Sequence, residues 1–340
     1  MTGEKFFTLP DGREAKLFKL RQPDGSGADI TNFGGCLVSL FIPDAAGNLR
    51  DVVLGWDKPE KYLDNFCNFG AIIGRVPNRI SGGKFVLDGR VYQMILNDRN
   101  ISTLHGGFSF AHRLWEVESA TDKELILTLF SPHGDAGFPG NLFVRASYRF
   151  TCGHTLEVEI TAESDRLTVA DFTTHAYFNL DGEDHLSTSD HFIRIAADRF
   201  TEIDANLLPT GKVQNVSGTI MDLRRGMTMG EFLMLKPGGA DDNFVIGEND
   251  RIFRKNAAYA IAGHSGITMA VHTNRPGIQF YMAGCLDQTV GKSIYPPHSG
   301  FCLETQCWPD AVNHDNFPDI FVKPGKPHHS ITRFEFDTVK

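Results

Sequence analysis

A carboxylate interrupts an apolar run near the C-terminus, and it is the first group in this chain that could do acid–base chemistry. Glu304 lies in residues 301–306, which otherwise have the pattern of a buried β-strand. Because side chains alternate between the two faces of a strand, Cys302, Glu304 and Gln306 project from the same face. Buried carboxylates are usually paired with an arginine or with backbone donors. The run therefore indicates either a structural ion pair or a functional site on that face.

Two glycine-flanked segments could bind an oxygen-rich ligand. Residues 74–80 place Arg79 beside Asn78, and a planar guanidinium can hold ligand oxygens through paired hydrogen bonds. His105 is followed by two glycines, which let the backbone bend and a ligand approach closely. An ordinary surface turn explains such segments equally well, so each needs other polar residues nearby to form a site.

Two further segments place polar pairs on expected strands. In residues 173–180, His175 and Tyr177 share a strand face, although a solitary histidine there is more often a hydrogen-bonded core residue. In residues 277–281, Gln279 and Tyr281 share a face. This neutral pair is suited to hydroxyl recognition and equally to ordinary cross-strand contacts.

The elements that must position these residues are mainly strands, because the dominant period of the apolar residues is two. Residues 156–162 alternate apolar and polar side chains, which predicts a half-exposed strand. Asp88 and Gly89 between the strand-like runs 84–87 and 90–93 predict a two-residue hairpin turn. Further strands are predicted for residues 125–130, 142–150, 192–196, 267–273, 278–282 and 331–336.

Helical stretches are few, and one is predicted near residues 227–235. Many closely spaced strands without alternating helices predict large antiparallel sheets packed face to face, which is an all-β sandwich. Neither a repeat nor a linker divides the sequence, so residues 1–340 are expected to form one domain. Residues 238–243 are predicted to be a loop that carries function.

Composition excludes several classes of protein. The formal charge of −9 and the lack of a Lys/Arg cluster argue against a nucleic-acid partner. The 27 phenylalanines indicate a thick aromatic core, and the six scattered cysteines form no Cys-x-x-Cys motif, so reduced buried thiols are expected. The N-terminal residues lack a signal-peptide core and no run reaches membrane-spanning length, so a cytoplasmic location without membrane contact is expected.

Taken in order, these segments resemble the aldose 1-epimerase (galactose mutarotase) family, from about residue 32 to the C-terminal strand. The resemblance implies a large antiparallel β-sandwich, the mutarotase-like supersandwich, with the site in a cleft on its concave face. It is carried by Gly74-Arg75, Asn78-Arg79-Ile80, residues 104–107, His175 with residues 177–180, residues 209–211, Asp241 with Asn243-Phe244, residues 279–281, 298–301, 304–306 and 309–311.

The resemblance also implies the chemistry, which is interconversion of the α and β anomers of a free aldose such as galactose or glucose. In this interpretation Glu304 removes the C1 hydroxyl proton as general base while His175 protonates the ring oxygen as general acid. The ring opens, the C1–C2 bond rotates and the ring recloses, without a metal or redox cofactor. The side chains implied to hold the sugar are those of Arg79, Asn78, His105, Asp241 and Gln279.

Several alternatives stay open at this point. A glycoside hydrolase could use Glu304 and Asp241 as its two carboxylates. A non-catalytic sugar-binding protein could keep the fold, and a sugar-phosphate 1-epimerase would add basic side chains such as Arg224, Arg225 or Lys84. Metal binding through His105, His175 or the pair His328-His329 is not expected, since ligand spacing is lacking. Thr174 and Asp242 stand where the family frequently has Asn and His, which leaves the preferred aldose open, and both a monomer and a homodimer are compatible with the sequence.

Overall fold

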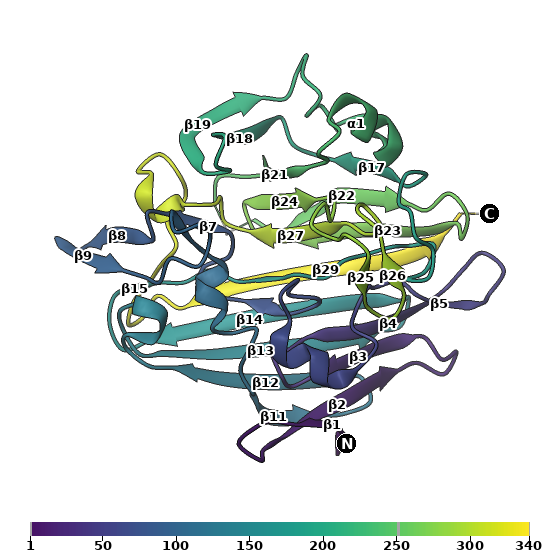
Figure 1. Ribbon diagram of the computed structural model, residues 1–340, viewed down its shortest axis with the longest axis horizontal. Helices are drawn as coiled ribbons and strands as arrows, with labels where there is room; N and C mark the ends of the chain where they lie inside the picture. Colours follow the sequence, from purple (N-terminus) through teal and green to yellow (C-terminus); the bar gives the residue numbers. More distant parts are fainter. Residues whose placement is uncertain (1, 250–251, 340) are drawn as a thin grey trace.

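The computed structural model describes residues 2–249 and 252–339 and consists mainly of antiparallel strands (Figure 1). Within these residues the largest sheet has nine strands, in the order β11-β12-β13-β14-β29-β23-β22-β17-β20. Their bounds are Glu116–Ala120 (β11), Glu124–Ser131 (β12), Leu142–Thr151 (β13), Thr155–Ser164 (β14), His328–Thr338 (β29), Ile267–Thr273 (β23), Arg254–Ile261 (β22), Phe192–Ile195 (β17) and Met227–Thr228 (β20).

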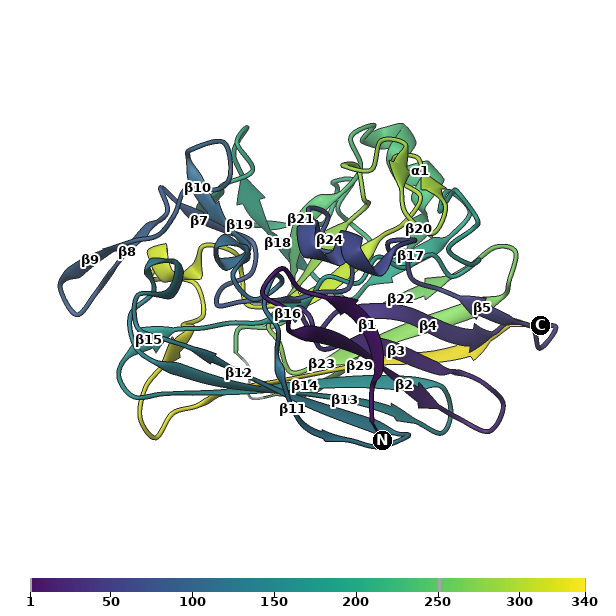
Figure 2. The ribbon, with the colours of Figure 1, turned by 60° about the horizontal axis from the view of Figure 1, so that its bottom comes forward.

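Two five-stranded sheets accompany it in the described part of the chain, ordered β1-β2-β3-β4-β5 and β19-β18-β21-β24-β27. Figure 2 shows the first of them lying as a layer over β13, β14 and β29. The bounds are Glu4–Thr8 (β1), Glu14–Arg21 (β2), Gly27–Thr31 (β3), Leu37–Pro43 (β4), Leu49–Asp51 (β5), Pro209–Asn215 (β19), Arg199–Ile203 (β18), Asp241–Val245 (β21), Gly277–Tyr281 (β24) and Cys302–Gln306 (β27).

Short strand pairs and short helices complete the described elements. The β8–β9 hairpin projects from one side of the molecule (Figures 1 and 2). The pairs are Arg79–Ser81 (β7) with Ser102–Leu104 (β10), Thr168–Val169 (β15) with Phe321–Val322 (β28), Ile72–Ile73 (β6) with Thr173–Thr174 (β16), Thr289–Val290 (β25) with Ile294–Tyr295 (β26), and Lys84–Leu87 (β8) with Arg90–Gln93 (β9). The helices are α1 (Met229–Leu235) and the 3₁₀ turns Pro59–Asp64, His105–Phe108, Asp135–Gly137 and Ala311–Asn313.

The core lies between the nine-stranded sheet and the layers that cover it. Alternate residues of β13 and β14, such as Val144, Tyr148 and Ile160, are buried in one continuous apolar cluster with Phe18 of β2 and Phe280 of β24. This is the result expected when one face of an antiparallel sheet is apolar. No helix in the described residues is long and apolar enough to cross a bilayer.

Most sequence predictions of secondary structure are confirmed, including the all-β sandwich, the strands and the Asp88-Gly89 turn, where both residues have positive φ. Two predictions were wrong. Residues 241–243, predicted as loop, begin strand β21 because Asp241 to Asn243 pair with β24. The strand expected to carry His175 and Tyr177 ends at Thr174 (β16), so the two residues lie outside it, although their rings do lie on the same side and stack.

A buried arginine ties the segment that precedes Asn78 to the connection between β12 and β13. Arg75 is 1% exposed. Burial lowers the pKa of its guanidinium to about 10, so Arg75 stays charged at neutral pH. Its donors are used mainly on backbone carbonyls, namely those of Ser131 (2.8 Å), Pro132 (3.0 Å), Pro139 (2.7 Å) and Gly140 (3.0 Å).

We expect Arg75→Met to lower the free energy of unfolding by about 3 kcal/mol or more, because several buried carbonyls lose their donor at roughly 1–3 kcal/mol each. Urea unfolding followed by circular dichroism measures this change. Arg145→Met is the control, since Arg145 pairs with Glu118 where the two side chains are 38% and 43% exposed, and such pairs contribute at most about 1 kcal/mol. Equal losses in the two variants would contradict the role given to Arg75.

Candidate active site

A cavity of about 220 Å³ brings together residues from segments far apart in the sequence. One molecule of liquid water occupies roughly 30 Å³, so the cavity has the volume of about seven water molecules and can hold a small ligand. Most of the residues that line it are polar or titratable. The lining residues are Phe66, Cys67, Asn68, Asn78, Arg79, Leu104, His105, His175, Tyr177, Asp241, Tyr281, Cys285 and Glu304.

Glu304 and His175 face each other in this cavity. Nε2 of His175 lies 3.8 Å from Oε1 of Glu304, and the two side chains are 6% and 3% exposed. The second carboxylate oxygen of Glu304 has no hydrogen-bond partner among the described residues. An unsatisfied buried oxygen is costly in a folded protein. A ligand hydroxyl placed beside Glu304 would therefore supply a missing bond.

His175 is held by a backbone hydrogen bond, by stacking of its ring and by a contact at one ring nitrogen. Its N–H donates to the carbonyl of Ala71 at 2.9 Å. The ring stacks on Tyr177 with centroids 4.9 Å apart, and Nδ1 lies 3.6 Å from the thiol sulfur of Cys302. Since Cys302 is two residues before Glu304 on β27, one strand face orients the ring through Nδ1 and presents a carboxylate to Nε2.

Burial disfavours the charged form of both partners. It raises the pKa of Glu304 well above the ordinary value, an effect that the charge of Asp241 increases and that of Arg79 opposes. Burial also lowers the pKa of His175 to about 4. Burial thus favours the state in which Glu304 is protonated and His175 is neutral, and because the two groups interact, their titration belongs to the pair. One donor and one acceptor are then present at the same time.

Arg79 lies between two carboxylates on the same wall. Its Nε donates to Asp98 at 2.9 Å, and one terminal nitrogen lies 3.8 Å from Asp241. Asn78, at φ +59°, accepts a hydrogen bond from the Arg79 N–H at 2.8 Å. Asp98 was missed by the sequence reasoning, and its only signal was its position in the polar turn before β10.

Gln279 supports Asp241 from behind. Its amide donates to Oδ1 of Asp241 at 2.7 Å, and across the sheet it pairs directly with Asn243 on one side and Glu304 on the other. Burial raises the pKa of Asp241, although Arg79 and Gln279 favour its charged form. Of the residues predicted from sequence, Glu304, His175, Arg79, Asn78, His105 and Asp241 line the cavity, whereas Gln279 does not.

His105 adds a second imidazole to the cavity. Its Nδ1 accepts a hydrogen bond from the Asn78 N–H at 3.3 Å, so the neutral ring carries its proton on Nε2. Burial lowers its pKa well below the ordinary value, and the neighbouring His175, with ring centroids 5.2 Å apart, lowers it further. His105 is thus a neutral hydrogen-bond donor rather than a cation.

Besides Leu104 and Tyr177, the wall contains Tyr281, Phe66, Cys67, Asn68 and Cys285, none of which was predicted as a site residue. Tyr281 was noted from sequence through the face that it shares with Gln279. The other four lie in loops without an apolar period, so no sequence pattern indicated their position.

One set of donor atoms in the cavity could hold a metal ion, namely those of His175, Cys302 and Glu304, which lie within 4.8 Å of one another. Nitrogen, sulfur and oxygen ligands suit zinc. Cys302 and Glu304, however, approach different nitrogens of the His175 ring, at 3.6 and 3.8 Å. Coordination of one ion by all three would require the ring to move.

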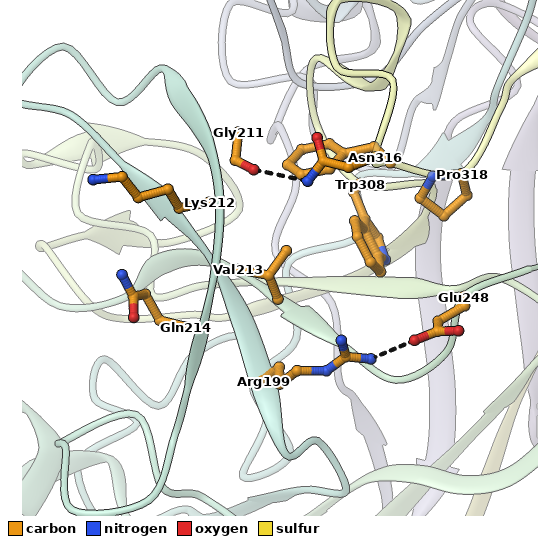
Figure 3. Close-up of a pocket in the computed structure, with 10 residues that line it drawn as sticks. Arg199, Gly211, Lys212, Val213, Gln214, Glu248, Trp308, Asn316 and Pro318 are labelled. Carbon is orange, nitrogen blue, oxygen red and sulfur yellow. Dashed lines mark hydrogen bonds and ion pairs between the residues drawn. The ribbon is translucent and has the colours of Figure 1, made fainter.

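A larger depression of about 750 Å³ lies elsewhere on the surface (Figure 3). Its charged groups include Arg199, which pairs with Glu248 at 2.8 Å, and Lys212. Its lining residues include no histidine, and their one carboxylate, that of Glu248, is already paired with Arg199. We therefore assign the candidate site to the smaller cavity.

We expect the His175 ring to remain neutral until the pH falls to about 4, because burial disfavours the imidazolium. Side-chain ¹⁵N NMR of histidine-labelled protein measures this titration, and the missing signal of His175→Asn assigns the resonance. Protonation of that resonance at the ordinary value of 6.5 would contradict the burial argument.

The chain matches the family model described as aldose 1-epimerase over residues 16–335. It is 40% identical to galactose mutarotase of Rattus norvegicus, with 99% of this chain and 98% of the relative covered, and 32% identical to aldose 1-epimerase of Escherichia coli K12, with 99% of each covered.

Solved structures agree with these sequence matches. A GalM/aldose epimerase homologue from C. elegans has a TM-score of 0.88 at 28% identity and covers 96% of this chain and 100% of its own. Galactose 1-epimerase from Lactobacillus acidophilus, at 24% identity, shares the fold with a TM-score of 0.85 over 100% of this chain and 99% of its own. With its strand order and its full-length matches, this chain belongs to the aldose 1-epimerase family.

Proposed function

We propose that this protein is an isomerase that interconverts the α and β anomers of a free aldose such as galactose or glucose. The observation that supports this most directly is the buried pair of Glu304 and His175, 3.8 Å apart, in a cavity whose wall also carries Arg79 and Asp241. Ring opening of an aldose needs one group that accepts the C1 hydroxyl proton and one that donates to the ring oxygen. The pair supplies both with a single proton.

Counting the protons on Glu304 and His175 assigns the roles of general base and general acid. In the reactive form Glu304 is a carboxylate and His175 is an imidazolium, which is the same proton count as the neutral pair. Glu304 accepts the C1 hydroxyl proton, His175 donates to the ring oxygen, and the C1–O bond of the ring breaks. The open-chain aldehyde then faces a neutral pair, the form that burial favours. After rotation about C1–C2, reclosure with the roles exchanged restores the ion pair.

The remaining polar side chains would bind hydroxyl groups. Asp241 can accept from two adjacent hydroxyls, Arg79 and Asn78 can donate to others, and the Nε2–H of His105 can donate near C1 or the ring oxygen. Gln279 acts in this proposal by orienting Asp241 rather than by touching sugar. These proton transfers call for no redox step, so we propose that no cofactor takes part.

A free sugar fits the charges better than a sugar phosphate. Arg224 pairs with Asp198 at 2.8 Å and Asp222 at 2.7 Å, and neither Arg224, Arg225 nor Lys84 lines the cavity. The cavity wall itself offers Arg79, which already faces two carboxylates. A phosphate dianion would meet more negative than positive charge there. We further propose that the chain acts as a single domain, as a monomer or a homodimer.

We expect the protein to accelerate the change in optical rotation of freshly dissolved α-D-galactose or α-D-glucose, measured by polarimetry. Glu304→Gln and His175→Asn should each lower kcat/KM by about 10²–10⁴-fold, since each removes a positioned acid or base. Glu118→Gln and His329→Asn are surface controls for the same substitutions, with side chains 43% and 51% exposed. Acceleration with hexose phosphates and not with free aldoses would contradict the proposed substrate.

The pH dependence of the same reaction tests the shared proton. Uptake of a second proton converts His175 to imidazolium while Glu304 stays protonated, which removes the acceptor. Because burial sets the pKa of His175 at about 4, kcat/KM should fall only as the pH drops through about 4. Rates corrected for spontaneous mutarotation, on protein shown to be folded at each pH, measure this. An acid limb centred on 6.5, the ordinary histidine pKa, would contradict it.

A further inference from the structure

Two cysteines from separate loops meet on the wall of the candidate active site. Cys67 follows the 3₁₀ turn Pro59–Asp64, and Cys285 lies in the turn after β24, yet both line the 220 Å³ cavity. Cys67 is 3% exposed, whereas Cys285 is exposed. The two side chains lie close enough to shift each other's pKa. The proposed sugar chemistry uses neither thiol.

Two phenols hold this pair in place. The hydroxyl of Tyr177 donates to the carbonyl of Cys67 at 3.0 Å and lies 4.0 Å from the sulfur of Cys285. The hydroxyl of Tyr281 accepts the N–H of Cys285 at 2.9 Å. Both rings also contact His175, with centroids 4.9 and 6.3 Å away. The thiols are therefore coupled to the imidazole through shared aromatic neighbours.

The two thiols have opposite chemical characters. The adjacent thiol of Cys67 lowers the pKa of Cys285 to about 6, and the hydroxyls of Tyr281 and Tyr177 act in the same direction while burial opposes them. The same contact raises the pKa of Cys67. An exposed thiolate beside a protonated thiol is the arrangement of an attacking and a resolving cysteine.

We propose that Cys67 and Cys285 are a redox modification site, in which a hydroperoxide converts the pair to a reversible disulfide that lowers the activity of the adjacent cavity. The Cys285 thiolate attacks the peroxide, the O–O bond breaks, and water or an alcohol leaves with a proton, giving Cys285 sulfenic acid. The Cys67 sulfur then attacks the Cys285 sulfur, the S–O bond breaks, and water leaves with the Cys67 proton. The peroxide gains two electrons and the two thiols lose them.

The disulfide would change the cavity because bonded sulfurs are only about 2.05 Å apart. Closing the thiol contact to that length draws the loop of Cys67 toward the turn of Cys285. Tyr177 is hydrogen-bonded to the first loop and stacked on His175. Movement of that loop is therefore passed to the imidazole that faces Glu304.

The first test treats the reduced, full-length protein with a small excess of hydrogen peroxide. We expect an intact mass lower by two hydrogen atoms and, after non-reducing digestion, a peptide that links Cys67 to Cys285. Dithiothreitol should reverse both. Cys67→Ser, whose hydroxyl can still donate to the Cys285 thiolate, should instead leave Cys285 as a sulfenic acid that dimedone traps. Absence of the linked peptide, or a disulfide formed by other cysteines in its place, would overturn the proposal.

Cys152 provides a matched control, because it is also an exposed thiol but its hydrogen-bond partner is the amide oxygen of Gln22 at 3.7 Å. At neutral pH, Cys285 should react with iodoacetamide about tenfold faster than Cys152, as expected for a stabilised thiolate. Equal rates would overturn the role of Cys285 as the attacking group.

The effect on activity rests on the proposed function and is measured separately. Mutarotation should slow at least about fivefold after peroxide and recover with dithiothreitol, while Cys285→Ser should not respond to peroxide. Unchanged mutarotation in protein that carries the disulfide would overturn the regulatory part. If the untreated protein shows no mutarotation, the proposed function fails, and the mass and labelling results still decide the modification site.

Discussion

The burial of a carboxylate against an imidazole, with no cation in direct contact among the described residues, is the constraint on which this site depends. Glu304 sits on β27, where all five residues are buried, and its second oxygen lacks a partner in the described chain. Desolvation of such a group costs several kcal/mol unless it is neutralised. Protonation of Glu304, which burial favours by raising its pKa, removes most of that cost and provides a proton that the pair can transfer. Burial of Glu304 against His175 thus disfavours the charged carboxylate and, for the same reason, suits the pair to reversible proton transfer.

Packing of the sheets offsets the free-energy cost of burying Glu304, and the sheets also fix the positions of the polar groups. The register of β21, β24 and β27 places Asn243, Gln279 and Glu304 side by side, and Asp241 opposite Tyr281. The opposite face of these strands contributes Phe244, Phe280 and Leu303 to the main apolar cluster. A shift by one residue would exchange the two sets of side chains. Core packing and site geometry are therefore set by the same pairing.

The groups that complete the cavity come from short, irregular segments. His105 and Asn78 both have positive φ, and His175 follows a strand of two residues. Such backbone is held by contacts from outside the segment, as with Arg75 and the carbonyls at residues 131–140. The loops of Cys67 and Cys285 are joined through Tyr177 in the same way. These side chains lie at connections, whereas Glu304 and Asp241 lie on strands, which give the site a rigid support.

The sequence by itself determined the strands, the sandwich and the family, because alternating apolar residues and an Asp-Gly turn act over a few positions and several motifs occur in order. It also determined which residue types could do acid–base chemistry, with Glu304 the clearest. Only the tertiary structure decided which of them meet. In the fold, His175 lies 3.8 Å from Glu304, and Gln279 donates to Asp241 instead of lining the cavity. Asp98, which binds Arg79, and the two thiols of the cavity wall were not predicted. The reason is physical: hydrogen bonds, desolvation and pKa shifts depend on distances that strand register and loop packing set, and no local pattern encodes those distances.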